Sequence, residues 1–302
     1  MNVFLTGGTG FVGSLLVRAL LDRGHEVTVL TRSSAHRPPA QGLSYLEADP
    51  VEKGSWQERV ADHDAVINMA GASIFTRWTD QAKQRIRDSR ILTTRNLVEG
   101  LSSPKGRGRL LISTSAVGYY GFHGDDVLDE TSPPGDDFLA SLARDWEATA
   151  LEAQRSGVRV VLARFGIVLG SRGGALSKMI PLFRRRLGSP LGSGRQWFSW
   201  IHEQDLAAGY LFLLDHPEAE GPVNCTAPNP VRNRELTALL GKTLGKTPFL
   251  PPVPGFMVRA VLGEFGSILL QGQRVLPGKL LEMGFRFRFP DLEAALEDLL
   301  NA

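Results

Sequence analysis

The sequence predicts an α/β protein built on a doubly wound parallel sheet. An apolar strand at residues 2–6 runs directly into the glycine-rich turn TGGTGFVG, and an amphipathic helix opens near Phe11. Short runs rich in Val, Ile and Leu then alternate with helix-like stretches up to about residue 170. Such alternation is typical of parallel strands joined by right-handed crossovers. The 302 residues suffice for one large domain with an annex, or for two domains.

The glycine-rich turn places Gly7, Gly10 and Gly13 three residues apart. In a strand–turn–helix unit the first glycine permits the sharp turn, and the second lets the backbone approach a pyrophosphate. The third lets helix and strand pack closely. The helix that follows presents unpaired N–H groups and the positive end of its dipole. We therefore expect a dinucleotide phosphate at this turn; the alternative is a glycine-rich turn without a ligand.

The second strand, residues 26–31, indicates which dinucleotide is preferred. Folds that bind NAD carry an acidic residue near the end of this strand, where it bonds the ribose 2′-hydroxyl. Here Thr31, Arg32 and Ser33 stand at that end instead. Because an arginine accommodates a 2′-phosphate, the sequence predicts NADP(H) as the cofactor. The alternative is that Arg32 is a solvated surface residue.

The remaining elements complete a Rossmann-type, NADP-binding core at residues 1–170, with residues 200–225 contributing. Small residues close the strand that ends in Ala70 and Gly71, where a cofactor would lie over the sheet edge. In chain order we expect strands at 43–49, 64–71, 109–115 and 158–170 and helices at 56–61, 79–101 and 138–156.

The texture of the sequence changes after residue 170. Residues 171–250 mix glycine-rich loops with helices and are expected to form a smaller substrate-binding region. The run 184–186 of three arginines is either a solvated helix face or a contact to an anionic substrate. Asn233 is expected to cap the helix that follows it. Residues 251–302 open on prolines, end in an amphipathic helix and are predicted to be a helical annex.

Composition argues against several classes of partner. The net charge is +2, and no nucleic-acid motif is evident, so we expect neither nucleic acid nor a membrane surface as partner. A lone cysteine, Cys225, allows no intrachain disulfide and suggests a reducing compartment. No apolar run approaches the ~20 residues that span a membrane, and the first strand leaves no room for a signal peptide. We expect a cytoplasmic protein that acts on a small molecule.

Five motifs carry a family resemblance. They are TGGTGFVG (6–13), NMAG (68–71), ISTSAVGYYG (112–121), ARFGIVLG (163–170) and WIHEQDLA (200–207). Together they resemble the extended short-chain dehydrogenase/reductase superfamily, which includes nucleotide-sugar epimerases. The segments GSGRQWFSWIH and GQRVLPGKLLEMGFRFRFPDLEAAL are similar to one atypical subgroup, the "epimerase family", whose members have their own C-terminal domain. This narrower resemblance covers nearly the whole chain.

The resemblance implies contacts to the cofactor. It assigns Thr9, Gly10, Phe11 and Val12 to the phosphates, Met69, Ala70 and Gly71 to the adenosine ribose and nicotinamide side, and the backbone around Phe165 and Ile167 to the nicotinamide carboxamide. Arg90 stands where the superfamily usually has an asparagine. It is expected to clamp a phosphate, to bind an acidic substrate group, or to form a helix-surface salt bridge. By analogy, a homodimer through helices 79–101 and 138–156 is also implied.

The catalytic pattern of the superfamily is incomplete in this chain. Hydride transfer at a carbon that bears oxygen needs a proton partner, for which the superfamily uses a tyrosine with a lysine four residues later. Ser115 matches the superfamily's accompanying hydroxyl. The two possible registers of the helix place either Phe138 and Leu142 or Leu139 and Ala143 at the tyrosine and lysine positions. The usual acid–base pair is therefore absent.

Ser115 and Tyr119 are the first candidates for the missing chemistry, because they lie at the carboxyl end of strand 109–115. Other candidates are Tyr120, Glu130, Asp136 and Asp137, whereas His202 is expected to be a helix cap or core residue.

Two functions follow from these candidates. The first is an NADP(H)-dependent oxidoreductase or epimerase-like enzyme with a non-standard proton donor. The second is a non-catalytic NADP(H)-binding redox sensor or regulatory protein. Phe198 stands where sugar-nucleotide members carry an arginine that grips the diphosphate, so a nucleotide-sugar substrate is in doubt.

Overall fold

Seven parallel strands form the central sheet of the computed structural model, which describes residues 1–35, 37–38, 40–246 and 250–301. The strand order is β11-β7-β5-β4-β1-β2-β3, so the chain winds outward from β1 in both directions. This confirms the predicted doubly wound fold. The strands are β1 (Asn2–Thr6), β2 (Glu26–Thr31), β3 (Leu43–Glu47), β4 (Ala65–Asn68), β5 (Leu110–Ala116), β7 (Arg159–Phe165) and β11 (Gly221–Cys225).

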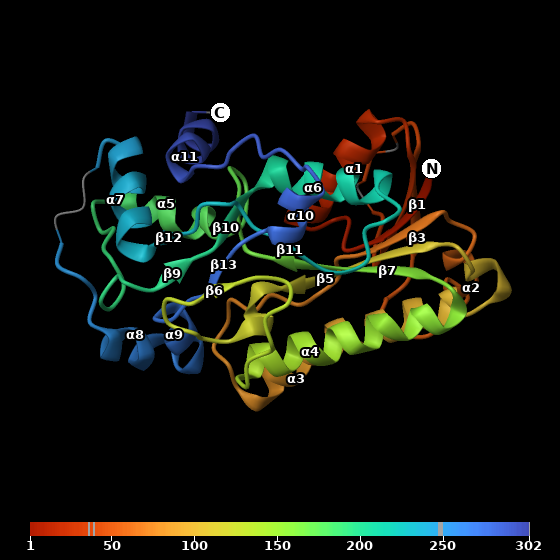
Figure 1. The fold of residues 1–302 in the computed structure, drawn as a ribbon, viewed down its shortest axis with the longest axis horizontal. Helices are drawn as coiled ribbons and strands as arrows, with labels where there is room; N and C mark the ends of the chain where they lie inside the picture. The colour runs from red at the N-terminus through yellow and green to blue at the C-terminus, as the bar shows by residue number, and fades with distance from the viewer. Residues whose placement is uncertain (36, 39, 247–249, 302) are drawn as a thin grey trace.

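Helices cover both faces of the sheet (Figure 1). One face carries α1 (Phe11–Asp22) and α6 (Glu203–Asp215); the other carries α3 (Asp80–Leu101) and α4 (Phe138–Leu151), with the short α2 (Gln57–Val60) beside α3. Because helices bury both faces at the centre of the sheet, the central strands are rich in Val, Ile and Leu. In β1, Val3 and Leu5 lie in the cluster that includes α1, whereas Phe4 lies in the cluster that includes α3.

Three short 3-10 turns join these elements. They are η1 (Pro104–Gly106), η2 (Val117–Tyr120) and η3 (Glu152–Ser156). The third continues α4, so the helix expected at 138–156 is present in two geometries. The second follows β5 directly and carries the candidate tyrosine to the carboxyl edge of the sheet.

The strand predicted at 158–170 is wrong as one continuous element. The chain leaves the main sheet at Gly166, and β8 (Ile167–Leu169) pairs with β10 (Trp200–His202) in a separate sheet. Gly166 N–H still donates to the Cys225 carbonyl, whereas the next N–H, of Ile167, donates to Ser199. Apolar residues continue through the break, so sequence periodicity could not reveal the change of partner.

The region after β8 contains α5 (Leu176–Arg184), β9 (Trp197–Phe198), β12 (Val231–Arg232) and α7 (Asn233–Thr243). The expectation that Asn233 caps α7 is wrong. Asn233 is the first helical residue, and its Oδ1 accepts from Leu191 N–H at 2.9 Å. The Asn233 side chain therefore binds the loop around residue 191 and does not cap the helix N-terminus, although the local sequence suggests that it would.

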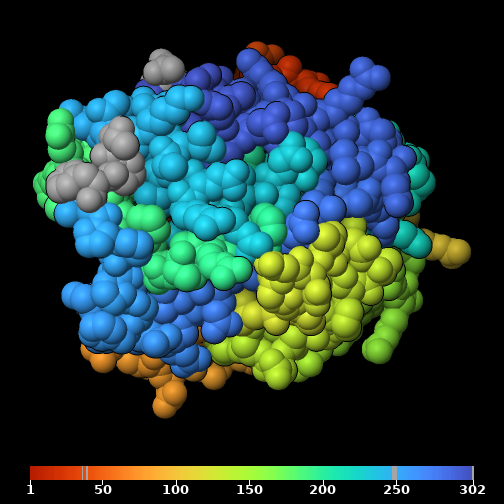
Figure 2. Space-filling view, turned by 60° about the vertical axis from the view of Figure 1, so that its left-hand side comes forward, coloured from red at the N-terminus to blue at the C-terminus, as the bar shows by residue number. Residues whose placement is uncertain are grey.

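The C-terminal residues form a strap across the main body. They comprise α8 (Gly255–Leu262), α9 (Glu264–Leu269), β13 (Arg274–Val275), α10 (Gly278–Glu282) and α11 (Leu292–Asn301), and β13 pairs with β6 (Val127–Leu128). Their buried residues join different clusters: Leu280 packs with α1 and α6, Val275 with Tyr120, and Leu296 with α7. Figure 2 shows these blue segments bordering the yellow segment around residues 120–135.

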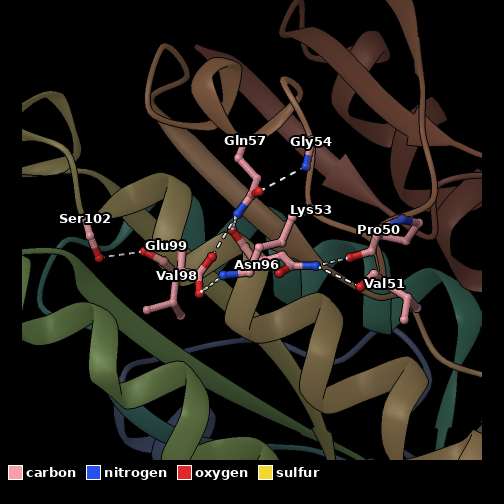
Figure 3. Close-up of polar contacts among 9 residues, drawn as sticks. All are labelled: Pro50, Val51, Lys53, Gly54, Gln57, Asn96, Val98, Glu99 and Ser102. Atoms are coloured by element: carbon pink, nitrogen blue, oxygen red, sulfur yellow. Dashed lines mark hydrogen bonds and ion pairs between the residues drawn. The ribbon is translucent and has the colours of Figure 1, made fainter.

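The loop that leaves β3 is held against α3 (Figure 3). Asn96 Nδ2 donates to the carbonyls of Pro50 at 2.9 Å and Val51 at 3.1 Å. Gln57 Nε2 donates in turn to the Asn96 carbonyl at 3.1 Å. These bonds fix the chain that passes the carboxyl end of β3, so this side of the sheet edge is preformed.

Asp205 ties the strap to α6, and its removal is expected to destabilise the fold. Its carboxylate accepts from the backbone N–H groups of Arg288 at 2.8 Å and Phe289 at 2.9 Å, and the residue is 2% exposed. Asp205→Ala leaves both donors without this partner, and we expect a loss of about 2–4 kcal/mol in the free energy of unfolding in urea. Gln204→Ala removes an exposed contact to the Arg288 side chain and should cost less than about 0.5 kcal/mol. Equal losses in both variants would contradict this.

Candidate functional site

The glycine turn lies directly against the chain that leaves β4. Gly7 has φ +72°, and a Cβ there would come within 2.7 Å of the Met69 carbonyl carbon. A Cβ on Gly13 would lie 2.2 Å from the Gly7 oxygen. The ends of β1 and β4 and the start of α1 therefore meet where the strand order reverses, which is where such sheets bind ligands.

The N-terminus of α1 opens to solvent. Thr9 and Gly10 are exposed, and among the described residues no side chain caps the first N–H groups, which belong to Phe11, Val12 and Gly13. The Phe11 ring points elsewhere, since a Cβ on Gly170 would lie 2.3 Å from it. The backbone N–H of Phe11 can therefore donate to a ligand at this edge of the sheet, while its ring packs on the loop after β8.

Arg32 extends from the end of β2. Thr31 Oγ1 donates to the Ser33 carbonyl at 3.0 Å, which fixes the turn. Arg32 is exposed and makes no ion pair within the described part of the chain. A cation is thus free at the strand neighbouring the glycine turn.

Arg90 is a desolvated cation beside Gly71. Its Nη1 donates to the carbonyls of Ala72 and Ile86, both at 3.0 Å, and its Cζ lies 5.3 Å from the Trp146 ring centroid. Burial lowers the pKa of Arg90 to about 10, so it stays charged at neutral pH. It has no carboxylate partner in the ranges that the structure describes. The expected alternative of a helix-surface salt bridge is therefore wrong.

Ser115 belongs to a buried polar network. Its hydroxyl donates to Glu147 Oε1 at 2.6 Å. Glu147, on α4, forms a bidentate ion pair with Arg164 on β7, at 2.8 and 2.7 Å. Arg164 also donates to Tyr120 Oη at 2.9 Å, and Tyr120 donates to Asn224 Oδ1 at 2.7 Å. Burial disfavours the charged guanidinium, but the hydrogen bonds and charge of Glu147 outweigh it and raise the pKa of Arg164.

The two neighbouring tyrosines differ in access. Tyr120 is fully buried, and burial raises its pKa to about 12. Tyr119 is half-buried, with its ring 5.4 Å from Tyr120 at a steep angle and the Arg164 Cζ 3.5 Å from its centroid. Only Tyr119 of this pair is accessible enough to meet a substrate.

The helix positions that carry the acid–base pair in the superfamily hold apolar residues here. Leu139 lies against Gly118 of η2 and in a cluster with Phe138 and Trp78. Ala143 is buried. Both registers considered from the sequence therefore place apolar side chains at the positions of the pair, and Leu139 lies beside η2.

The weaker acid–base candidates have structural partners. Asp137 caps α4 by accepting from Leu139 and Ala140 N–H. Glu130 accepts from Asn224 N–H, and burial raises its pKa. His202 caps α6, as expected.

Ile167, expected near the nicotinamide carboxamide with Phe165, is 37% exposed just beyond the break between β7 and β8.

Sequence reasoning missed the ion pair at the centre of this site. Arg164 stands inside an apolar strand, and a charge within such a run needs a buried partner. That mismatch was the available signal. The identity of the partner depends on how α4 packs against β7, which brings Glu147 to Arg164. The network then extends through Tyr120 to Asn224, which is distant in sequence.

A glycine turn, an open helix N-terminus and a desolvated arginine thus converge on one sheet edge, which defines a doubly wound protein with a dinucleotide-type site. The family model "NAD dependent epimerase/dehydratase family" matches residues 3–225. The chain therefore belongs to the NAD dependent epimerase/dehydratase family. Residues 253–299 match a second model, a domain of unknown function called DUF1731. The resemblance to the epimerase family is confirmed.

Known relatives align along the whole chain. It is 43% identical to the epimerase family protein SDR39U1 homolog, chloroplastic, of Arabidopsis thaliana, over 100% of this chain and 87% of that protein. It is 39% identical to the epimerase family protein YfhF of Bacillus subtilis, over 99% and 98%. The crystal structure of human epimerase family protein SDR39U1 (isoform2) with NADPH aligns at TM-score 0.87 and 35% identity, over 100% and 99%. In the ranges that the structure describes, no helix is both long and apolar enough to cross a membrane.

His202 is expected to make stability fall in acid. Its Nδ1 accepts from Gln204 N–H at 3.1 Å, and the ring, fully buried, stacks on Phe289. Burial lowers its pKa from 6.5 to about 4, against the charge of Asp298. The imidazole of His202 therefore becomes protonated below about pH 6.5 in the unfolded chain, but only near pH 4 in the folded protein. Between these values the unfolding free energy should fall by at most about 1.4 kcal/mol per pH unit on this account.

Urea unfolding across that pH range tests the point with His202→Asn. Asparagine keeps a side-chain acceptor at the start of α6 but does not titrate. The variant should lose the part of the pH dependence between 6.5 and about 4 that His202 contributes. An unchanged slope would show that other groups dominate.

Proposed function

We propose that this chain is an NADP(H)-dependent oxidoreductase or epimerase-like enzyme acting on a small molecule. The observation that carries the proposal is Arg90, a desolvated cation without a carboxylate partner among the described residues. It lies against Gly71, in the chain segment that packs on the glycine turn before the open N-terminus of α1. The Arg90 guanidinium and the open helix N-terminus together favour an anionic ligand. The relative solved with NADPH supports the choice of cofactor.

The residues present fit a dinucleotide. The turn around Gly7 could not hold a Cβ without displacing the chain after β4, and this close approach brings Met69, Ala70 and Gly71 to the same edge. In the proposal, the N–H groups of Phe11 and Val12 and the side chain of Arg90 bind the pyrophosphate. Residues Thr31, Arg32 and Ser33 take the 2′-phosphate, and the backbone at Phe165 and Ile167 faces the carboxamide. When bound, the cofactor supplies or accepts a hydride.

Tyr119 is the proposed proton donor. A phenol at the carboxyl edge can give a proton to an oxygen that gains charge during hydride transfer. Ser115 already donates its proton to Glu147, so in the proposal its oxygen accepts a hydrogen bond from a substrate hydroxyl. The apolar wall of Phe138 and Leu139 beside η2, and Phe198 in place of an arginine, favour a substrate other than a nucleotide sugar.

A second candidate function is a non-catalytic NADP(H)-binding sensor or regulator. It is favoured by the apolar residues at the positions of the acid–base pair in either register of α4, and by the hydrogen bond that the Ser115 hydroxyl already donates to Glu147. A sensor must bind NADPH and NADP⁺ with different affinities, because equal affinity shifts no equilibrium. Titration with both forms separates the two functions.

The domain limits given above, and a homodimer through α3 and α4, stay part of the proposal.

Arg32→Ala is expected to weaken preference for the phosphorylated cofactor. Loss of the guanidinium removes a charge-assisted contact to the 2′-phosphate, so NADPH affinity should fall by about tenfold or more. NADH lacks that phosphate, so its affinity should barely change. Calorimetric titration with both cofactors measures the ratio. Arg95→Ala, at an exposed arginine of α3, is the matched control and should leave both affinities unchanged. An equal loss for NADPH and NADH would contradict the assignment.

Tyr119→Phe is expected to lower turnover to a small residual rate while NADPH affinity stays intact. The change removes only the phenol oxygen, and loss of a general acid slows proton transfer by about 10²–10⁴-fold. The measurement uses NADPH deuterated at the transferable position, a metabolite extract and mass spectrometry of the products. Ser115→Ala should also lower turnover. Full deuterium transfer by both variants would remove Tyr119 and Ser115 from the mechanism.

A further inference from the structure

The planar cation of Arg164 is held along its edge. Its Nε and Nη2 donate to the two carboxylate oxygens of Glu147, and its Nη1 donates to Tyr120 Oη. Arg164 is 3% exposed and Glu147 is 5% exposed, so water does not compete for these bonds. Three bonds in one plane leave the guanidinium no freedom to rotate without breaking several of them.

One face of that plane is covered by Tyr119. The Arg164 Cζ lies 3.5 Å from the Tyr119 ring centroid, compared with 5.0 Å for Tyr120. A cation at this distance from a ring face is attracted by the ring electrons. The main chain of Tyr119 is held separately, because its carbonyl accepts from Gly135 N–H at 2.9 Å. Backbone and ring are therefore fixed by different contacts.

Ser115 is tied to the same ion pair. Its hydroxyl and Arg164 Nε share one carboxylate oxygen, Oε1 of Glu147. A displacement of Glu147 would thus move both residues that the proposed function uses. The network reaches across the fold, since β5 carries Ser115, α4 carries Glu147 and β7 carries Arg164.

We propose that Arg164, held by Glu147, is the positioning residue for Tyr119, so that a cation from strand β7 takes the place of the missing lysine on α4. This inference rests on the proposed function. Lysine could not do the same work from β7, because a single ammonium cannot make a two-pronged bond to a carboxylate and also stack on a ring. Arg164 touches neither substrate nor cofactor in this scheme and acts through Tyr119.

A double-mutant cycle distinguishes positioning from a purely structural role. Four proteins are compared: wild type, Arg164→Lys, Tyr119→Phe and the double variant. The readouts are the rate of deuterium transfer from labelled NADPH into the product that wild type labels, the dissociation constant for NADPH, and the melting temperature. We expect Arg164→Lys to lower the transfer rate about 100-fold through a misplaced phenol, with the dissociation constant changed by less than about twofold. In the Tyr119→Phe background, Arg164→Lys should cause no further loss.

One control variant and one substitute variant accompany the cycle. Arg87→Lys alters the cation of an exposed ion pair with Asp145, between α3 and α4, and should leave the transfer rate unchanged. Should Arg164→Lys fail to fold, Glu147→Asp retains the buried pair but draws the guanidinium away from Tyr119. Because Glu147 also holds the Ser115 hydroxyl, Glu147→Asp is expected to lower the transfer rate much more with Tyr119 present than in the Tyr119→Phe background, where only the share that acts through Ser115 is left.

The outcomes are separable. Equal losses from Arg164→Lys with Tyr119 present and absent, or a full rate in Arg164→Lys, would overturn the positioning role and leave the proposed function standing. No transfer by the wild-type protein would overturn the proposed function, and this inference with it. A loss confined to the background that contains Tyr119 supports both.

Discussion

The ion pair between Glu147 and Arg164 is the interaction on which the rest of the site depends. It joins α4 to β7 below the carboxyl edge of the sheet, holds the Ser115 hydroxyl, and lies under the Tyr119 ring. Removing one partner of such a pair leaves an uncompensated buried charge, which typically costs about 3–5 kcal/mol. Replacing both partners by apolar residues would cost far less, so stability alone does not explain why the pair is present.

The same pair bears on the apolar residues that stand at two positions of α4. In the superfamily that this chain resembles, α4 carries both the acid and its cation. Here those positions hold either Phe138 and Leu142 or Leu139 and Ala143, and the buried cation at the Tyr119 ring is Arg164 of β7. The polar network is thus shifted below the sheet edge, and only Tyr119 extends from it toward solvent. This arrangement suits one accessible phenol on a rigid support.

The C-terminal strap completes this support. Asn224 receives the Tyr120 hydroxyl and donates through Nδ2 to the Leu276 carbonyl, so the network continues into the C-terminal residues. Glu130 accepts from the N–H groups of Asn224 and Lys279, which joins the acidic loop to the same segment. The strap therefore packs into the core of the family domain, although a separate family model matches it. Its removal would uncover the network from which Tyr119 extends.

The parallel sheet, the glycine turn at Gly7, Gly10 and Gly13, and the lack of a tyrosine–lysine pair could all be predicted from the sequence, because each is a local pattern of a few residues. The partner of Arg164, the lack of a carboxylate partner for Arg90 among the described residues, and the break at Gly166 became visible only in the folded structure. These depend on which distant segments meet across α4, β7 and the strap. Local sequence carries the propensity of a segment to be a strand or a helix, whereas the environment of a charge is set by long-range packing.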